Sequence, residues 1–396
     1  MTLRLSRRYR LFILLIVFLI VFPAGCASPS EAGRVRASVA EAMTGDGDGA
    51  FQRATEVRTF TFPLDHGPHN QFRTEWWYYT GNLANEEGDA YGYQLTFFRT
   101  ALTGEAVQRA SDLATNQVYM AHFALTDGRA RRHVSFERYA RGDGVLAGAA
   151  GDPGYRVWLE DWQAVEFEPG MSRLQANALT ETGETIALDL LLEQTTEPLL
   201  HGNAGLSRKG SAAGNANYYY SIPRLNTSGT ITVGERVTTV AGLSWMDHEF
   251  GTSALDAGTR GWDWFSLQLD DGTNLMLGEL HDGMGENRFV MEGTLALPNG
   301  EQRGLGADDF TLRAMGEWTS PRTDITYPSA WTLTLPGQEM ELIITPLIPD
   351  QEMDISFVYY EGAITVEGVR KGAPVSGQGY VELTGYGDRQ LAEYQR

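Results

Sequence analysis

Residues 245–251 (WMDHEFG) bring two carboxyl groups and an imidazole together between large apolar side chains. In an extended strand, neighbouring side chains point to opposite faces, so Trp245, Asp247 and Glu249 would share one face and His248 the other. Two carboxyl groups on one face can share a proton, which raises the pKa of one of them, and an imidazole held by a carboxylate can act as a general base. The segment therefore predicts either an acid–base site or a polar plug that closes a barrel end or joins two domains.

Residues 74–79 (TEWWYY) place a carboxylate beside four consecutive aromatic residues. Glu75, Trp77 and Tyr79 would share one face of a strand, and Trp76 and Tyr78 the other. A strand with bulky aromatic residues on both faces is covered on one side and faces either a packed core or a cavity on the other. An acid in that setting is either a satisfied core group or a working acid, and we expect Glu75 to support an acid–base network.

Two later segments add weaker candidates for the same site. Trp262, Asp263 and Trp264 are consecutive, and Glu279 and His281 end a predicted strand whose earlier residues on that face are apolar. Such a change is expected at the mouth of a pocket, although strand ends commonly turn polar. His66 and His69 are separated by a Gly-Pro turn without a CxxC or HExxH motif, so we predict no metal. No sequence signature of a nucleotide, dinucleotide or serine-hydrolase site is present, and we expect no cofactor.

The composition predicts an all-β protein. The chain contains 45 glycines and many Thr, Tyr, Phe and Trp residues, with hairpin signals such as residues 85–89 and 270–273 between alternating apolar runs. Removing the first 25 residues, which hold four arginines and no acid, leaves 27 basic and 51 acidic residues and a net charge of −24. Such an acidic surface repels nucleic acid, so we expect no nucleic-acid partner.

An internal repeat predicts two related domains. The aromatic run at 76–79 and the run at 262–265 (WDWF) are each followed by an acidic glycine turn and an apolar strand. The spacing is about half of the chain. We therefore expect two antiparallel β-barrels, one over residues 56–240 and one over 241–396.

The N-terminus indicates export. Residues 1–25 combine four arginines with an apolar run of twelve residues, from Leu11 to Phe22, which is typical of a signal peptide. Cys26, the one cysteine of the chain, follows Pro-Ala-Gly, a sequence that resembles a lipoprotein box except for Pro23. An ordinary secretory signal is the alternative. Residues 26–55 are expected to form a flexible tether. Because Ala27 rather than Asp follows the cysteine, we expect a lipid-anchored protein that faces the periplasm, at the outer membrane.

Several separated segments resemble one protein family. Residues 62–83 (FPLDHGPHNQFRTEWWYYTGNL), 245–251, 261–269 (GWDWFSLQL) and 379–386 (GYVELTGY) resemble the AttH / carotenoid 1,2-hydratase group. The resemblance covers about residues 60–387. It implies two lipocalin-like β-barrels with an apolar cavity and no redox cofactor. The hydratase branch adds water to a terminal isoprenoid double bond through a buried aspartate, for which Asp247 and Asp263 are the nearest candidates in this sequence.

From these patterns we expect a protein that binds an elongated apolar molecule, isoprenoid or lipid-like, in an aromatic cavity. Our hypothesis is acid-catalysed hydration or isomerisation of a C=C bond, in which Asp247 donates the proton, Glu249 raises its pKa and His248 handles water. The predicted ligand-binding set is Glu75, Trp76, Trp77, Tyr78, Tyr79, Trp245, Trp262, Trp264, Glu279 and His281. The alternative is a non-enzymatic carrier that passes a hydrophobic ligand to an ABC transporter.

Overall fold

The computed structural model describes residues 50–104, 115–252, 255–256, 258–282 and 288–387. The expected signal peptide, Cys26 and the first part of the expected tether lie outside these residues. The described chain is built almost entirely from antiparallel strands, with two 3-10 turns, η1 (Leu64–His66) and η2 (Pro336–Gln338). Within the described residues, no helix is long and apolar enough to cross a bilayer. The all-β prediction is confirmed.

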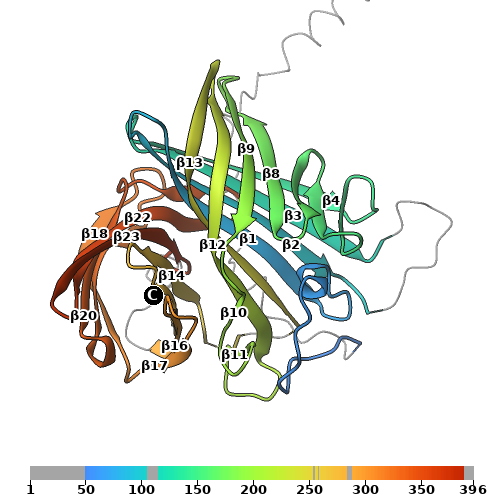
Figure 1. The fold of residues 1–396 in the computed structure, drawn as a ribbon. Helices are drawn as coiled ribbons and strands as arrows, with labels where there is room; N and C mark the ends of the chain where they lie inside the picture. The colour runs from blue at the N-terminus through green and yellow to red at the C-terminus, as the bar shows by residue number, and fades with distance from the viewer. Residues whose placement is uncertain (1–49, 105–114, 253–254, 257, 283–287, 388–396) are drawn as a thin grey trace, which may run out of the picture. The chain divides into compact units, whose positions relative to one another are not determined.

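The first sheet has the strand order β4-β3-β2-β1-β13-β12-β9-β8-β7-β6-β5, with β10 and β11 paired to β12. Its central strands, β1, β12 and β13, carry the aromatic and acidic segments noted in the sequence (Figure 1). The strands are β1 (Thr74–Ala84), β2 (Ala90–Ala101), β3 (Gln117–Asp127), β4 (Arg132–Arg141), β5 (Ala147–Ala150), β6 (Arg156–Leu159), β7 (Trp162–Glu168), β8 (Met171–Leu179), β9 (Thr185–Gln194), β10 (Leu199–Leu200), β11 (Leu206–Arg208), β12 (Ala216–Val233) and β13 (Arg236–Gly251).

The second sheet has the order β17-β16-β15-β14-β23-β22-β20-β19-β18, with β21 paired to β22. Its strands are β14 (Gly261–Leu269), β15 (Asn274–His281), β16 (Arg288–Ala296), β17 (Gln302–Gly306), β18 (Thr311–Thr319), β19 (Thr326–Leu335), β20 (Met340–Pro346), β21 (Glu352–Asp354), β22 (Val358–Arg370) and β23 (Ala373–Leu383).

The two sheets share one topology over nine strands, beyond which the first sheet continues to β6 and β5. In each, the first strand lies between the second strand and the last one, and β1, β2, β3, β4, β13, β12, β9, β8 and β7 correspond in order to β14, β15, β16, β17, β23, β22, β20, β19 and β18. This correspondence agrees with the internal repeat. The change of sheet falls between Gly251 and Gly261, so the boundary expected at 240 lies inside β13, a strand that pairs with β1 and β12. The aromatic-acidic segment 245–251 was assigned to the wrong half because it closes the first sheet.

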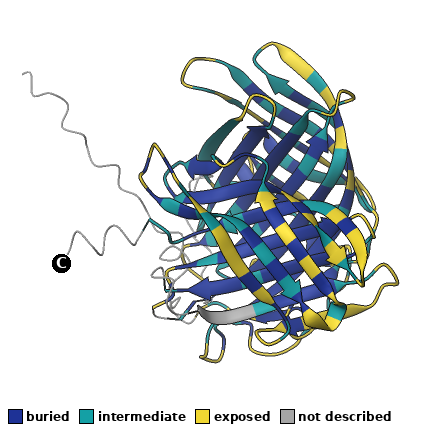
Figure 2. Cartoon of the chain, turned by 90° about the vertical axis from the view of Figure 1, so that its left-hand side faces the viewer, coloured by how far each residue is buried: buried dark blue, intermediate teal, exposed yellow. Residues whose placement is uncertain are grey.

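Each sheet encloses an apolar core, as the two-residue periodicity of its strands requires. Trp77, Tyr79 and Met246 contribute to the first core, and Phe265 and Trp331 to the second. Figure 2 shows buried residues along the strand centres and exposed ones at many hairpin loops. Burial of one large apolar side chain contributes about 1.5–3 kcal/mol. With a single cysteine in the chain, this burial is the main source of stability.

The two sheets contact each other through a pair of matching hydrogen bonds. Asn82 Nδ2 of β1 donates to the carbonyl of Gly379 at 2.7 Å, and Gln268 Nε2 of β14 donates to the carbonyl of Ser244 at 2.9 Å. Asn82 and Gln268 occupy corresponding positions of the repeat, as do Ser244 and Gly379. Gly92 of β2 lies so close to the second sheet that a Cβ atom there would be 2.4 Å from the Cβ of Ala363.

The end of the expected tether is part of the folded unit. The amide of Gln52 donates to the carbonyl of Gln71 at 3.0 Å, and the hydroxyl of Thr252 donates to the carbonyl of Gln52. Ala54 is buried against Phe250 and its neighbours. The prediction of a flexible segment up to residue 55 is therefore wrong for residues 52–54, because small residues without an apolar pattern can still pack at the edge of a core.

Candidate active site

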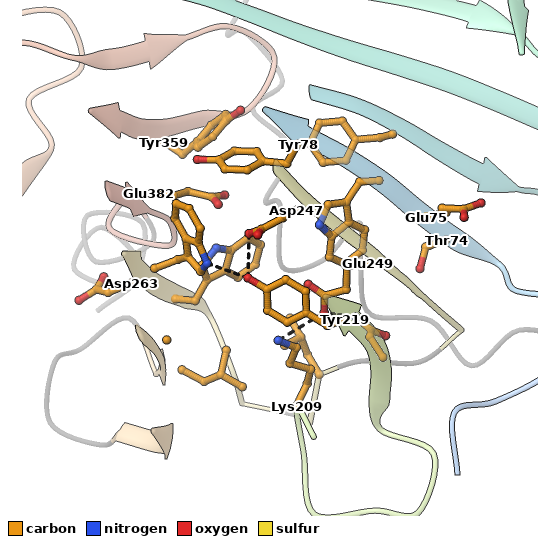
Figure 3. Close-up of a pocket in the computed structure, with 18 of the residues that line it drawn as sticks. Thr74, Glu75, Tyr78, Lys209, Tyr219, Asp247, Glu249, Asp263, Tyr359 and Glu382 are labelled. Carbon is orange, nitrogen blue, oxygen red and sulfur yellow. Dashed lines mark hydrogen bonds and ion pairs between the residues drawn. The ribbon is translucent and has the colours of Figure 1, made fainter. Parts of the chain in front are cut away.

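A cavity of about 160 Å³ lies where the two sheets meet. Aromatic residues from both sheets contribute to its wall, and several carboxyl groups face it (Figure 3). Its lining includes Trp76, Tyr78, Phe98, Met120, His122, Lys209, Asn217, Tyr219, Asp247, Glu249, Trp262, Asp263, Trp264, Met276, Glu279, Glu292, Phe357, Tyr359, Glu361 and Glu382. Acids in so apolar a setting are costly to ionise, and this setting determines their chemistry.

Asp247 of β13 is a cavity acid that accepts hydrogen bonds from three neutral donors. Its Oδ2 accepts from the Tyr219 hydroxyl at 2.7 Å, and its Oδ1 accepts from the Trp245 indole at 2.6 Å and from the Ser221 hydroxyl. Burial raises its pKa to about 7 even though these three bonds favour the carboxylate, and the charge of Glu249 adds to the increase. Near neutral pH, Asp247 can therefore both donate and accept a proton.

A chain of hydrogen-bonded polar groups holds the residues that donate to the Asp247 carboxylate. Trp264 of the second sheet donates its indole N–H to the Tyr219 oxygen at 2.9 Å, which orients that hydroxyl toward Asp247. Ser221 Oγ lies 2.5 Å from His201 Nε2, and His201 Nδ1 lies 2.9 Å from the Thr294 hydroxyl. Burial lowers the pKa of His201 well below its ordinary value, so the imidazole is neutral and has one donor and one acceptor nitrogen.

Glu249 has partners of its own and does not share those of Asp247. Its Oε1 accepts from Asn217 Nδ2 at 2.7 Å and lies 3.3 Å from the Lys209 ammonium, which is also 3.6 Å from Glu292. Burial alone would lower the pKa of Lys209, but Glu249 and Glu292 outweigh it and the pKa is raised. Glu249 is therefore paired with the Lys209 ammonium group. The predicted sharing of a proton between Asp247 and Glu249 is not found, and Glu249 acts on Asp247 through its charge.

Two further acids lie in the second sheet. Glu361 of β22 and Glu382 of β23 are directly opposed across the strand pair, and the Tyr78 hydroxyl of the first sheet donates to Glu361 Oε2 at 2.8 Å. Burial raises the pKa of Glu361, and the charge of Glu382 adds to this. Burial also raises the pKa of Glu382, to about 8, although the Trp262 side chain hydrogen-bonds to its carboxylate.

Sequence reasoning missed Glu361 and Glu382 because each stands alone among apolar residues, outside any acidic cluster. Their relationship comes from the pairing of β22 with β23. A single glutamate at an inward position of a buried strand is the signal that would have indicated them. Sequence reasoning also missed Lys209 and Tyr219, because they reach the cavity from segments without a recognisable motif.

His248 lies on the other face of β13, inside the first sheet. Its Nε2 is 2.9 Å from Glu75 Oε1 and its Nδ1 is 2.9 Å from the Tyr220 hydroxyl. The strand alternation predicted this orientation correctly, but the same alternation prevents His248 from handling water beside Asp247. That part of the proposed catalytic set is wrong, since His248 points away from the cavity that Asp247 faces and is absent from its lining.

Glu75 forms a buried charge network with Arg99 and two histidines. Its Oε2 accepts from Arg99 Nε at 2.9 Å, and its Oε1 lies 2.8 Å from His69 Nδ1. Burial alone would raise the pKa of Glu75, but Arg99 and the two histidines outweigh it and hold the pKa well below its ordinary value. Ligand atoms of His69, Glu75 and His248 lie within 4.8 Å of one another, close enough for a metal ion. In this structure they pair with one another and with Arg99.

The remaining predicted residues divide between cavity and core. Trp76, Tyr78, Trp262, Trp264, Asp263 and Glu279 line the cavity, as does Glu75. Trp77 and Tyr79 do not, because they point into the first core, where the Trp77 indole donates to the carbonyl of His66 at 3.0 Å. Trp245 is outside the lining, and its indole N–H donates to Asp247. His281 is 3.5 Å from Asp263 and outside the lining, and Asp263 accepts from the Tyr386 hydroxyl at 2.9 Å.

The fold and the site together define a class of all-β proteins in which two sheets of like topology meet at an aromatic cavity lined by carboxyl groups. The chain belongs to the AttH-like family, whose model matches residues 53–386. The crystal structure of an AttH protein from Nitrosomonas europaea is 35% identical and superposes with a TM-score of 0.72, covering 85% of this chain and 100% of that one. The family resemblance seen in the sequence is confirmed.

Two curated fungal proteins are also similar. Kievitone hydratase of Fusarium solani subsp. phaseoli is 24% identical over 50% of this chain and 57% of its own length. The dehydratase asqC of Emericella nidulans is 23% identical over 50% of this chain and 58% of its own. The aligned region thus spans little more than half of these relatives. A structure of kievitone hydratase from Nectria haematococca shares the fold, with a TM-score of 0.63 and 15% identity over 86% of this chain and 98% of that one.

Proposed function

We propose that this protein is a cofactor-free hydro-lyase that adds water to a C=C bond of an apolar substrate or removes water to form one, with Asp247 as the proton donor. The observation that carries the proposal is Asp247 itself, a cavity carboxyl group held by three donors with a pKa raised to about 7. The names of the two fungal relatives, a hydratase and a dehydratase, support the same class of reaction.

The reaction needs one proton given and one taken. Protonated Asp247 gives its proton to one carbon of the double bond, and the oxygen of a water molecule bonds to the other carbon and releases a proton. Dehydration is the reverse. Positive charge that develops on the substrate carbon would be stabilised by aromatic faces such as those of Trp76 and Trp264. A correctly placed general acid contributes about 10²–10⁴-fold in rate.

The size of the cavity restricts what it can enclose. An engineered cavity of about 150 Å³ binds benzene, so the 160 Å³ here suits one ring or one isoprene unit. We therefore propose that the end of an elongated substrate enters the cavity and the rest extends outside it. This refines the expectation of a cavity for a whole elongated molecule.

Turnover in ¹⁸O-labelled water tests the proposal. The full-length protein in detergent is incubated with kievitone and with a carotenoid that has a terminal isoprenoid double bond, and mass spectrometry follows the gain of one labelled water. We expect Asp247→Asn to lower the rate by about 10²–10⁴-fold. The control Glu352→Gln removes another buried carboxyl group, one that is bonded by Thr323 and Tyr327 outside the cavity, and should keep its activity. Wild-type turnover in Asp247→Asn would overturn the assignment.

The alternative proposal is a carrier that hands its ligand to an ABC transporter. In that case Asp247 is structural, and Asp247→Asn lowers the melting temperature because it breaks a buried hydrogen-bond network. Organic extraction of the protein purified from its own host separates the two proposals. A co-purifying phospholipid supports the carrier, and an isoprenoid or a hydrated product supports the enzyme.

A further inference from the structure

We propose that Glu361 and Glu382 form a second proton-exchanging centre in the cavity, which binds a neutral oxygen of the substrate or the reacting water. The inference rests on the proposed function and fills the role left open by His248, namely the group that takes the proton from water. Neither residue belongs to the acidic segment that the sequence indicated.

The internal repeat places the two centres at corresponding positions. In the first sheet, Tyr78 of β1 is directly opposed to Asp247 of β13. In the second sheet, Trp264 of β14 is directly opposed to Glu382 of β23. Trp264 is the third residue of the second aromatic run, as Tyr78 is of the first, so Glu382 occupies the place in its sheet that Asp247 occupies in the other. Directly opposed residues of an antiparallel pair point to the same face, which here is the cavity.

The neighbouring strand shows how the two centres differ. Asp247 is opposed to Ser221 of β12, whose hydroxyl donates to it. The corresponding neighbour of Glu382 is Glu361 of β22. The first centre therefore consists of one acid and one hydroxyl, and the second of two acids. The charges of two carboxyl groups on directly opposed residues repel each other, so the pair retains a proton near neutral pH.

Each sheet also supplies a hydrogen-bond donor that orients the centre of the other sheet. Tyr78 of the first sheet donates to Glu361, and Trp264 of the second sheet donates to Tyr219, which donates to Asp247. Each centre is thus oriented by an aromatic residue from the opposite sheet. This reciprocity follows the matching Asn82 and Gln268 hydrogen bonds described above and makes both centres parts of one site.

Two unsatisfied atoms show where a ligand would bind. Glu361 is 1% exposed, and its Oε1 has no hydrogen-bond partner in the part of the chain that the structure describes. His122, also 1% exposed, contacts the Tyr359 hydroxyl at 2.7 Å through Nδ1, while its Nε2 has no partner among the described residues. Both residues line the cavity. A buried polar atom left without a partner costs free energy, which a bound oxygen would recover.

The charges around these atoms favour a neutral ligand. Burial lowers the pKa of His122 to about 3, so its imidazole is neutral, and burial together with Glu382 raises the pKa of Glu361. Lys209 is held by Glu249 and Glu292 and is not available to pair with an anion here. A hydroxyl, a carbonyl or a water molecule matches the neutral imidazole of His122 and the carboxyl group of Glu361.

The reaction then balances between two centres. In hydration, protonated Asp247 gives its proton to carbon and becomes a carboxylate. The water oxygen bonds to the other carbon, and its proton passes to one oxygen of a carboxyl group in the Glu361–Glu382 pair as the other oxygen of that group releases the proton it holds. The released proton returns to Asp247 through solvent. Dehydration runs through the same groups in the opposite direction.

Rates and infrared spectra of the full-length protein test the proposal together. The variants are Glu361→Gln, Glu382→Gln and Asp247→Asn, with Glu352→Gln as the control. We expect each of the first three to lower turnover at least about 100-fold with a melting temperature close to that of the wild type. We also expect the C=O stretch of protonated carboxyl groups at pH 7 to lose intensity in Glu361→Gln and Glu382→Gln but not in the control.

The outcomes separate this inference from the proposed function. Wild-type turnover in both glutamine variants, with an inactive Asp247→Asn, overturns the second centre and leaves the proposed function in place. Wild-type turnover in Asp247→Asn overturns the proposed donor, and the infrared spectra then decide on the pair alone. An unchanged spectrum in both glutamine variants overturns the pair. If one variant fails to fold, the other provides the same measurement.

Discussion

Asp247 and Glu75 are buried carboxyl groups on adjacent strands, and their surroundings shift their pKa values in opposite directions. Asp247 is surrounded by neutral donors, so burial raises its pKa to about 7. Glu75 contacts Arg99, whose charge outweighs the effect of burial and lowers its pKa. Such opposite environments distinguish a carboxyl group that can exchange protons near neutral pH from one that stays ionised.

The effect of Asp247 on stability should depend on pH. Its pKa is raised from 3.8 in the unfolded chain to about 7, so the folded state holds the extra proton and stability is lost as the pH rises across this interval. We expect the free energy of unfolding of Asp247→Asn, relative to the wild type, to increase between pH 4 and pH 8 by about 4 kcal/mol. Urea unfolding at several pH values measures it, and a pH-independent difference would contradict it.

Glu75 should contribute strongly to stability. Replacement by Gln leaves the guanidinium of Arg99, which is 0% exposed, without its counterion. Removing one partner of a buried ion pair costs about 3–5 kcal/mol. As a control, Asp189→Asn breaks an exposed pair with Arg173 and should cost no more than about 1 kcal/mol. Equal losses for the two variants in urea unfolding would show that Glu75 has no special role.

At the scale of strands, the sequence was sufficient to predict which side chains share a face of a strand. It was insufficient to predict which strands pair with one another. The alternation in residues 245–249 correctly separated Asp247 from His248, because side-chain direction depends only on local geometry. It could not show that Trp77 faces a core while Tyr78 faces a cavity, since both faces are aromatic. Nor could it bring Glu361 beside Glu382, because strand pairing over long sequence separation depends on the topology of the whole sheet.

The contact of β2 with β22 should be sensitive to one methyl group. In Gly92→Ala, the new Cβ would meet the Cβ of Ala363 at 2.4 Å, and neither strand can move without disturbing its ladder. Overpacking of this kind costs about 1–3 kcal/mol. Gly304 of β17 is a matched control, since a Cβ there meets nothing within 4 Å. Thermal unfolding of Gly92→Ala and Gly304→Ala measures the difference, and equal melting temperatures would contradict the close approach of the sheets.

At the scale of the whole molecule, both sheets contribute to the cavity, so the site exists only when they are joined. The sequence predicted two like halves and an aromatic cavity, because aromatic runs and turns recur at a regular interval. It placed the boundary too early, because the strand that closes the first sheet follows a long hairpin. We propose that the folded unit is attached to the cell envelope through Cys26, which lies outside the described residues.

Lipidation of Cys26 is testable by metabolic labelling. In a Gram-negative host, the wild-type protein should incorporate an alkyne fatty acid and begin at Cys26, because the basic and apolar leader is followed by a lipobox-like sequence. Cys26→Ser should lose the label, and Ser28→Ala should keep it. An unlabelled wild-type protein would indicate an ordinary secretory signal. Separation of inner and outer membranes tests the expected outer-membrane location, which Ala27→Asp should change.

The difference between Ser221 and Glu361 at corresponding positions has a consequence for how a substrate enters. A cavity between two repeated halves offers a symmetrical molecule two reversed poses of nearly equal energy. Ser221 gives one half a hydroxyl and Glu361 gives the other a second carboxyl group, so the two poses are no longer equivalent. The product of a unique pose is a single regioisomer. Under the proposed hydration, the difference between Ser221 and Glu361 would help to determine which carbon receives the hydroxyl group.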